Sequence, residues 1–233
     1  MVDAFTGFEM TQVTLVSLAR NFGWGVENES AVHAVEDALR SQGSVGFCSE
    51  FGEREDLLWG ATGRVEILED SQQLRNRSFD AAMIVTHRLV EEQIRDIPYP
   101  VAVIRPKNLA VGLINAEPVG GEELQRRVRD GIRSFGLAWG SVAKLATANS
   151  DPGRDAVEAL TEEFKLRYET FSEDRLNEVT EPGGSSGRAN PQWAESAAIL
   201  ASGSPGSSRN LMGLDSLEGP TRLAVALITR RLE

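Results

Sequence analysis

The stretch SFDAAMIVTHRLVEEQIRDIPYPVAVIRPKNLAVGLI, residues 78–114, decides the fold. It contains three apolar runs, Ala81–Val85, Val101–Ile104 and Leu109–Ile114. Apolar runs without polar alternation are typical of strands buried on both faces of a parallel sheet. Between the first two runs, RLVEEQI (Arg88–Ile94) predicts a crossover helix, and Pro106 separates the second run from the third. The stretch therefore predicts an α/β protein whose two parts meet near Pro106.

The same pattern extends in both directions. Towards the N-terminus we expect a short helix around Val13–Phe22, a helix after Asn28 or Ser30, and strands Ser44–Cys48 and Arg64–Leu68. Towards the C-terminus we expect helix Glu122–Phe135, strand Val142–Ala146, a helix capped by Asp151 with Pro152 as its first residue, a strand around Leu166–Tyr168, a helix near Ser172, a helix from Asn190 and Pro191 through Ala201, and two closing strands, the second at Leu223–Ile228. The sequence thus predicts two small three-layer α/β domains, residues 1–106 and 107–233, with mainly parallel or mixed sheets.

Composition excludes several classes of partner and site. The formal net charge of −11 opposes binding to nucleic acid or to an anionic membrane surface. Cys48 is the only cysteine, so no intramolecular disulfide can form, and His33 and His87 are too few for a closed Cys/His zinc site. We expect no metal site. No signal peptide and no apolar run of about 18 residues is present, which predicts a soluble, cytoplasmic protein without a membrane span.

Two loops carry candidate binding residues, although no P-loop, nucleophile elbow, HExxH or CxxC occurs. His87 and Arg88 follow strand Ala81–Val85, and open α/β sheets bind ligands at the carboxyl ends of strands. A solvated loop is the alternative interpretation. In GGSSG (Gly183–Gly187), Ser185, Ser186 and the backbone N–H groups suit substrate carboxylates. The alternative for this loop is a flexible surface segment.

Several segments resemble the CbiG family of cobalamin biosynthesis, the cobalt-precorrin-5A hydrolases. Residues 78–113 are similar to its "(Y/F)DAvilvTdr" and "pvlvlRP" segments and to the glycine-containing strand that follows. The matching residues are Phe79, Asp80, Ala81, Val85, Thr86, Arg88, Arg105, Pro106, Val111, Gly112, Glu122, Glu123 and Leu124. The segments VTLVSLARNFGWGVEN, LATA (145–148), WAESAAIL (193–200) and LAVALITRR are similar to "lDelAkrLGw.ien", "laTid", "vaEaAall" and "vtvAiar". The resemblance places residues 1–106 with the family's central region and 107–233 with its C-terminal region.

One departure lies at the turn after the third apolar run. Where the family has "GiGcrrGts", this chain has GLINAEPVGG, in which Gly112 is kept and Asn115–Pro118 replace the Cys–Arg–Arg–Gly run. Two arginines at such a turn suit a polycarboxylated substrate, because the guanidinium group pairs with carboxylates in a bidentate manner. With Ala116 and Glu117 in their place, we expect weak affinity for the family's substrate.

The resemblance implies a reaction and a site. The family opens the δ-lactone of a cobalt-corrinoid and releases acetaldehyde, which requires a general base and stabilisation of negative charge. Glu195 is the matching carboxylate that we expect to be catalytic, the alternative being a helix-dipole partner. We expect Gly112, Asn115 and Thr147 to bind substrate in a cleft at the carboxyl ends of Leu109–Ile114 and Val142–Ala146. Segments 115–121, 147–149 and 183–187 would bound that cleft.

Two functions stay open. One is a hydrolase with an altered pocket and no bound cofactor. The other is a non-catalytic relative that binds a corrinoid, a related tetrapyrrole or a partner protein. The loss of the arginine pair, and the lack of a counterpart to the family's usual N-terminal domain, favour the second. Homo-oligomerisation is compatible with either.

Overall fold

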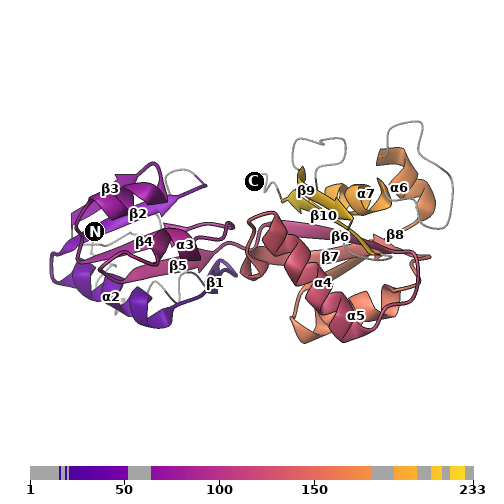
Figure 1. The fold of residues 1–233 in the computed structure, drawn as a ribbon, viewed down its shortest axis with the longest axis horizontal. Coiled ribbons are helices and arrows are strands. Elements are labelled where there is room, and N and C mark those ends of the chain that lie inside the picture. The colour runs from indigo at the N-terminus through magenta and orange to yellow at the C-terminus, as the bar shows by residue number, and fades with distance from the viewer. Residues whose placement is uncertain are drawn as a thin grey trace, which may run out of the picture. The chain divides into compact units, whose positions relative to one another are not determined.

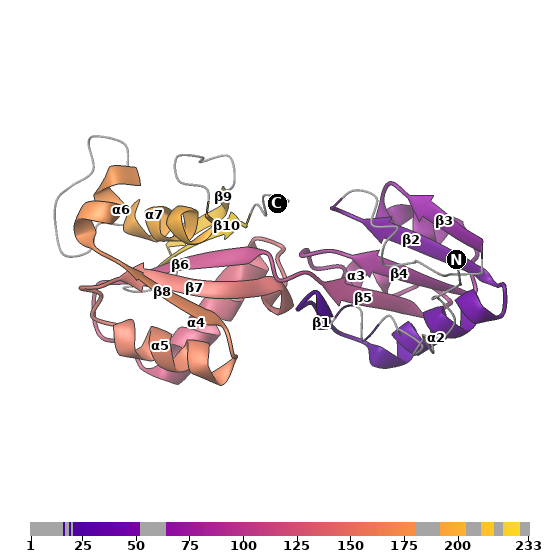
Figure 2. The ribbon, with the colours of Figure 1, turned by 180° about the vertical axis from the view of Figure 1, so that it is seen from behind.

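The computed structural model describes Val16, Ala19 and residues 21–51, 64–179, 192–203, 211–216 and 221–228. The chain divides into two compact units. The first is Met1–Thr86 with Val90–Pro106, and the second is His87–Leu89 with Lys107–Glu233. Each unit has one five-stranded mixed sheet packed with helices (Figures 1 and 2), which confirms the predicted fold class.

The first unit has the strand order β1-β5-β4-β2-β3. Its strands are β1 (Gly25–Val26), β2 (Ser44–Ser49), β3 (Arg64–Leu68), β4 (Ala81–Val85) and β5 (Val101–Arg105), all parallel except β1, which is antiparallel to β5. Helix α2 (Glu29–Arg40) covers one face, and η2 (Ser71–Asn76) and α3 (Glu91–Ile94) cover the other. Because both faces are covered, every residue of β4 is buried, as its unbroken apolar run predicts.

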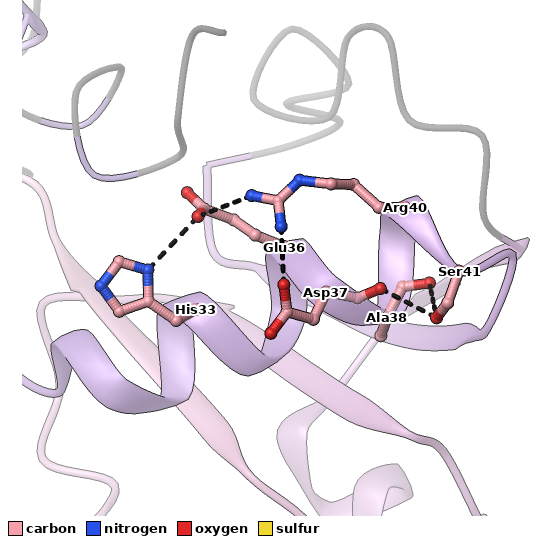
Figure 3. Close-up of polar contacts among 6 residues, drawn as sticks. All are labelled: His33, Glu36, Asp37, Ala38, Arg40 and Ser41. Carbon is pink, nitrogen blue, oxygen red and sulfur yellow. Dashed lines mark hydrogen bonds and ion pairs between the residues drawn. The ribbon is translucent and has the colours of Figure 1, made fainter.

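Helix α2 is stabilised by its cap and by charged pairs between residues one turn apart. The Asn28 side chain accepts a hydrogen bond from the Ala31 N–H at 3.2 Å, which caps the first turn. Figure 3 shows Glu36 between His33 and Arg40, with Nδ1–Oε2 and Nη2–Oε2 distances of 3.4 Å each. Arg40 also pairs with Asp37 at 2.6 Å. These contacts between residues one turn apart stabilise the helix, and they give the His33 ring a partner within the same helix.

The crossover helix predicted for Arg88–Ile94 is shorter than expected, and only α3 is helical. Arg88 forms an isolated antiparallel bridge with Leu137, and the Leu89 N–H donates to the Gly136 carbonyl at 2.8 Å. This backbone pairing holds Arg88 and Leu89 outside the helix, which begins only after Val90.

The second unit has the strand order β8-β7-β6-β10-β9. Strands β6 (Leu109–Asn115), β7 (Val142–Ala148) and β8 (Arg167–Phe171) are parallel, β10 (Thr221–Leu227) is antiparallel to β6, and β9 (Leu211–Ser216) is antiparallel to β10. Helices α4 (Gly121–Ser134) and α5 (Arg154–Glu163), with η3 (Trp139–Ser141), lie on one side, and α6 (Glu173–Val179) and α7 (Gln192–Ala201) lie on the other (Figure 1).

The two faces of this sheet carry different side chains. Larger residues such as Leu113, Leu145 and Val225 pack against α4 and α5. Small residues, among them Ala146 and Ala224, pack against the alanine-rich face of α7. Small side chains on both partners let α7 approach the sheet closely. No described helix is long and apolar enough to span a membrane.

Candidate functional site at the carboxyl edge of the second sheet

The carboxyl ends of the parallel strands β6 and β7 lie at one edge of the second sheet, where open sheets accept ligands. Helix α4 begins beside this edge with Gly121, and an open depression is lined by Gly120–Glu123 and Arg126. Hydrogen bonds from Arg126 and then Arg127 hold the pKa of Glu123 below its usual range. The charge of Glu123 is therefore already compensated within the helix.

Asn115, the last residue of β6, is fully buried and belongs to a network of side chains. Its backbone N–H and its Nδ2 donate to the Asp151 carboxylate at 2.8 and 3.1 Å. Its Oδ1 accepts from the Thr221 hydroxyl at 2.8 Å, and Asp151 also accepts from the Gly153 N–H at 2.7 Å. The network links β6 to β10 and to the turn before α5. The polar atoms of the Asn115 side chain therefore already have hydrogen-bond partners within the protein.

The same turn corrects the predicted start of the next helix. Asp151 does not cap a helix starting at Pro152; α5 begins at Arg154, with Gly153 in the capping position. The reason is that the Asp151 carboxylate binds Asn115 in addition to the Gly153 N–H. A Cβ atom on Gly153 would lie 2.5 Å from Asn115 Nδ2, so the turn requires glycine there.

Gly112 and Thr147 also make contacts within the second unit. A Cβ atom on Gly112 would lie 2.0 Å from the Ala194 carbonyl oxygen and 2.6 Å from the Ala198 nitrogen. The Thr147 hydroxyl is fully buried and donates to the Leu113 carbonyl at 2.7 Å. Gly112 thus permits close packing of α7, and Thr147 links β7 to β6.

Glu195 differs from these residues. It lies in the first turn of α7 and is partly buried, and burial raises the pKa of its carboxyl group. Among the described residues no hydrogen bond or ion pair engages its carboxylate. Trp193 of this turn donates to Asn177 of α6, and α6 begins just after the carboxyl end of β8, so the first turn of α7 lies towards the carboxyl ends of the strands. A partly desolvated carboxyl group in that place can exchange a proton with a ligand.

The other predicted site residues are not brought to this edge by the described structure. The His87 carbonyl accepts from the Ala138 N–H at 2.8 Å, and Arg88 pairs with Leu137. Both contacts lie just before β7 begins, at the amino end of the strands. Ser185 and Ser186 lie outside the described residues.

The first unit offers no thiol nucleophile. Burial, with the nearby charges of Asp70 and Glu50, raises the pKa of Cys48 to about 11. A thiol with such a pKa stays protonated and unreactive near neutral pH. Within the described ranges, no group of three or more His, Cys, Asp and Glu side chains could hold a metal ion.

Asp151 and Thr221 are polar residues of this edge that the sequence interpretation did not place there. Asp151 follows a predicted strand and precedes Pro152, a pattern that predicts a helix cap. Thr221 pairs with Asn115 across 106 positions of sequence. Nothing local to either residue indicates that partnership.

Comparisons with known proteins gave structural likenesses. No family model and no curated protein matches the chain. Cobalamin biosynthesis protein chiG from Agrobacterium tumefaciens is similar over 52% of this chain and 99% of its own, at 21% identity and a TM-score of 0.41. A cobalamin biosynthesis protein G homolog from Sulfolobus solfataricus is similar over 95% of this chain and 62% of its own, at 16% identity and a TM-score of 0.43. CobE, a protein from the cobalamin (vitamin B12) biosynthetic pathway, is similar over 52% of this chain and 90% of its own, at 18% identity and a TM-score of 0.42.

Proposed function

We propose that the protein is a CbiG-like protein of corrin biosynthesis that binds a corrinoid, or a related tetrapyrrole, at the carboxyl edge of the second sheet. The proposal rests on the sequence resemblance in segments 78–113, 145–148 and 193–200. The observation that carries it is Glu195, a partly buried carboxyl group with a raised pKa and no partner among the described residues. Groups with such pKa values are typical of sites that transfer protons.

The finer proposal is hydrolysis of a lactone on the corrin ring. Glu195 as carboxylate takes a proton from water while the water oxygen bonds to the lactone carbonyl carbon. The ring C–O bond then breaks, and the proton passes from Glu195 to the leaving oxygen. A pKa nearer neutrality suits both directions of this transfer. No side chain among the described residues caps the start of α4, and the N–H groups of its first turn offer positive potential for the negative charge that develops.

A second candidate is a relative that binds the corrinoid without turnover. The observation that favours it is that Gly112, Asn115 and Thr147 are engaged in contacts within the protein. The turn at Ala116 and Glu117 also lacks the arginine pair of the family. In this candidate the edge recognises a ligand or presents it to a partner protein. Glu195 then contributes to recognising the ligand.

One experiment separates the two candidates. The chain is incubated with a cobalt-corrin δ-lactone, and acetaldehyde and ring-opened product are measured beside binding. We expect Glu195→Gln to lower turnover by about 10²–10⁴-fold if Glu195 is the general base. Glu163→Gln, on exposed α5 surface, is the matched control and should leave turnover unchanged. Binding without turnover in the parent favours the second candidate, and neither binding nor turnover contradicts both.

A further inference from the structure

Arg222 is a second charged residue at this edge whose side chain has no partner among the described residues. It is the second residue of β10, and its neighbour Thr221 is in register with Asn115 at the end of β6. The side chain is partly buried. Among the described residues, no hydrogen bond, ion pair or ring contact engages its guanidinium group. Partial burial of an uncompensated charge is unfavourable, which suggests that a ligand supplies its partner.

The alternation along β10 tells which face carries Arg222. Leu223 and Val225 pack with the core under α4 and α5, whereas Ala224 and Ala226 pack with the core under α7. Side chains two residues apart share a face of a strand. Arg222 therefore lies on the α7 face, beside Ile114, its register partner on β6.

The helical period places Glu195 on the same side of α7 as β10. Ala194 faces the sheet over Gly112, and successive helix positions are about 100° apart. Trp193 donates from its indole Nε1 to Asn177 of α6 at 2.8 Å, and α6 follows the edge strand β8. Glu195, on the other flank of Ala194, is thus directed away from β8, towards β10 and β9.

We propose that Arg222 and Glu195 form a carboxylate-binding corner, in which Arg222 binds a carboxylate of the ligand next to the Glu195 carboxyl group. This inference rests on the proposed function and deepens it, because it names the cation that recognises a polycarboxylated ring. The family's arginine pair stood on the β6–α4 turn, whereas here the positive charge comes from the neighbouring strand β10. A guanidinium group suits this role because its planar donors match both oxygens of a carboxylate.

Two probes and four variants of the full chain test the corner by calorimetric titration. The probes are cobyrinic acid, a polycarboxylated corrin, and citrate, a polycarboxylate without a corrin ring. We expect Arg222→Met to weaken binding of both probes by tenfold or more, and Arg222→Lys to have an intermediate effect. Arg167→Met is the matched control, since Arg167 is an exposed strand arginine at the amino end of β8, and it should change nothing. Glu195→Gln should tighten binding several-fold, because it removes a negative charge beside the bound anion.

The outcomes distinguish the corner from the corrinoid function. If Arg222→Met binds cobyrinic acid as tightly as the parent, the corner is wrong while the corrinoid function stands. If the parent binds citrate through Arg222 but does not bind cobyrinic acid, the corner stands and the corrinoid function is wrong. A parent that binds neither probe overturns both. Equal thermal unfolding midpoints of the parent and Arg222→Met would attribute any loss of binding to the site rather than to the fold.

Discussion

Arg105 in the first unit and Arg222 in the second are both strand arginines, but their surroundings differ. Arg105 ends β5 and is fully buried, and it donates through Nε and Nη2 to the two Glu27 oxygens at 2.7 and 2.9 Å. Its Nη1 donates to the Thr86 carbonyl at 3.2 Å. Arg222 is partly buried, and no described residue pairs with it. The first charge is compensated within the fold, whereas the second is available to a ligand.

The same difference divides the residues that resemble the CbiG family into those whose contacts stabilise the fold and those that are candidates for binding. Arg105 belongs to the "RP" segment shared with the family, yet its guanidinium group joins the ends of β5 and β4 to the loop after β1. Gly112 is likewise shared and is used for packing. Glu195 is shared and has no partner among the described residues. A shared residue is therefore a candidate for binding only when its polar group is not already engaged.

The largest effect should follow from filling the space that Gly112 leaves for α7. In Gly112→Ala the new methyl group meets backbone atoms of Ala194 and Ala198, which cannot move unless α7 shifts. We expect a loss of about 3 kcal/mol in the free energy of unfolding, measured by denaturant titration. Gly121→Ala, where no atom lies within 4 Å, should be neutral or stabilising. Equal stability of the two variants would show that α7 does not pack closely against Gly112.

The second effect tests the two arginines directly. Arg105→Met breaks a buried ion pair, and the cost should be about 2 kcal/mol, less than for a fully buried pair because Glu27 is 41% exposed. Arg222→Met should change the unfolding free energy by less than about 0.5 kcal/mol. Chemical denaturation of both variants at one ionic strength checks this. A larger loss from Arg222→Met than from Arg105→Met would reverse the comparison.

The third effect is a pH dependence of the first unit. The Ser44 N–H and hydroxyl donate to Asp80 at 2.7 and 2.9 Å, and these bonds hold the pKa of Asp80 below its usual range. Since the folded pKa is lowered, the stabilisation is present above about pH 4 and is lost as pH falls through the folded pKa.

The parent should therefore have a higher unfolding midpoint than Asp80→Asn near neutral pH. Measured from about pH 2.5 to 7, this difference should shrink only at the acid end. Ser44→Ala, which keeps the backbone donor, should lose part of this dependence. A parent and Asp80→Asn that stay equally far apart in stability at every pH would contradict the role of Asp80.

The smallest effect concerns the β6–α4 turn. Restoring the family's charges with Ala116→Arg and Glu117→Arg should strengthen binding of a polycarboxylated corrin. Both positions are exposed, so the gain should be about 1 kcal/mol rather than the 1–3 kcal/mol of partly buried pairs. Titration calorimetry at low and high salt should show this gain fading as salt rises. A double variant that binds no better than the parent would remove the electrostatic argument for this turn.

Local pattern was enough to predict much of the fold. The apolar runs that became β4, β5 and β6, and the amphipathic stripe of α4, indicate burial without knowledge of their partners. The short α3 could not be predicted, because the pairing of Arg88 with Leu137 decides where it begins.

The site was predictable only in part. The carboxyl edge follows from parallel strands, and Glu195 follows from the family resemblance. The network of Asn115, Asp151 and Thr221 depends on contacts between distant parts of the chain, which no local pattern reveals. Arg222 gives no signal in sequence, since its importance depends on what its strand places around it.

Hydrogen exchange of the full chain with and without cobyrinic acid tests most directly where the ligand binds. We predict slower exchange on binding at the first turn of α7, residues 192–196, at the start of β10, residues 221–223, and at the start of α4. Residues around Arg105 and Glu27 should exchange at unchanged rates, because their charges are already paired. Slower exchange confined to the first unit, at the ends of β2 and β4, would contradict the proposed location.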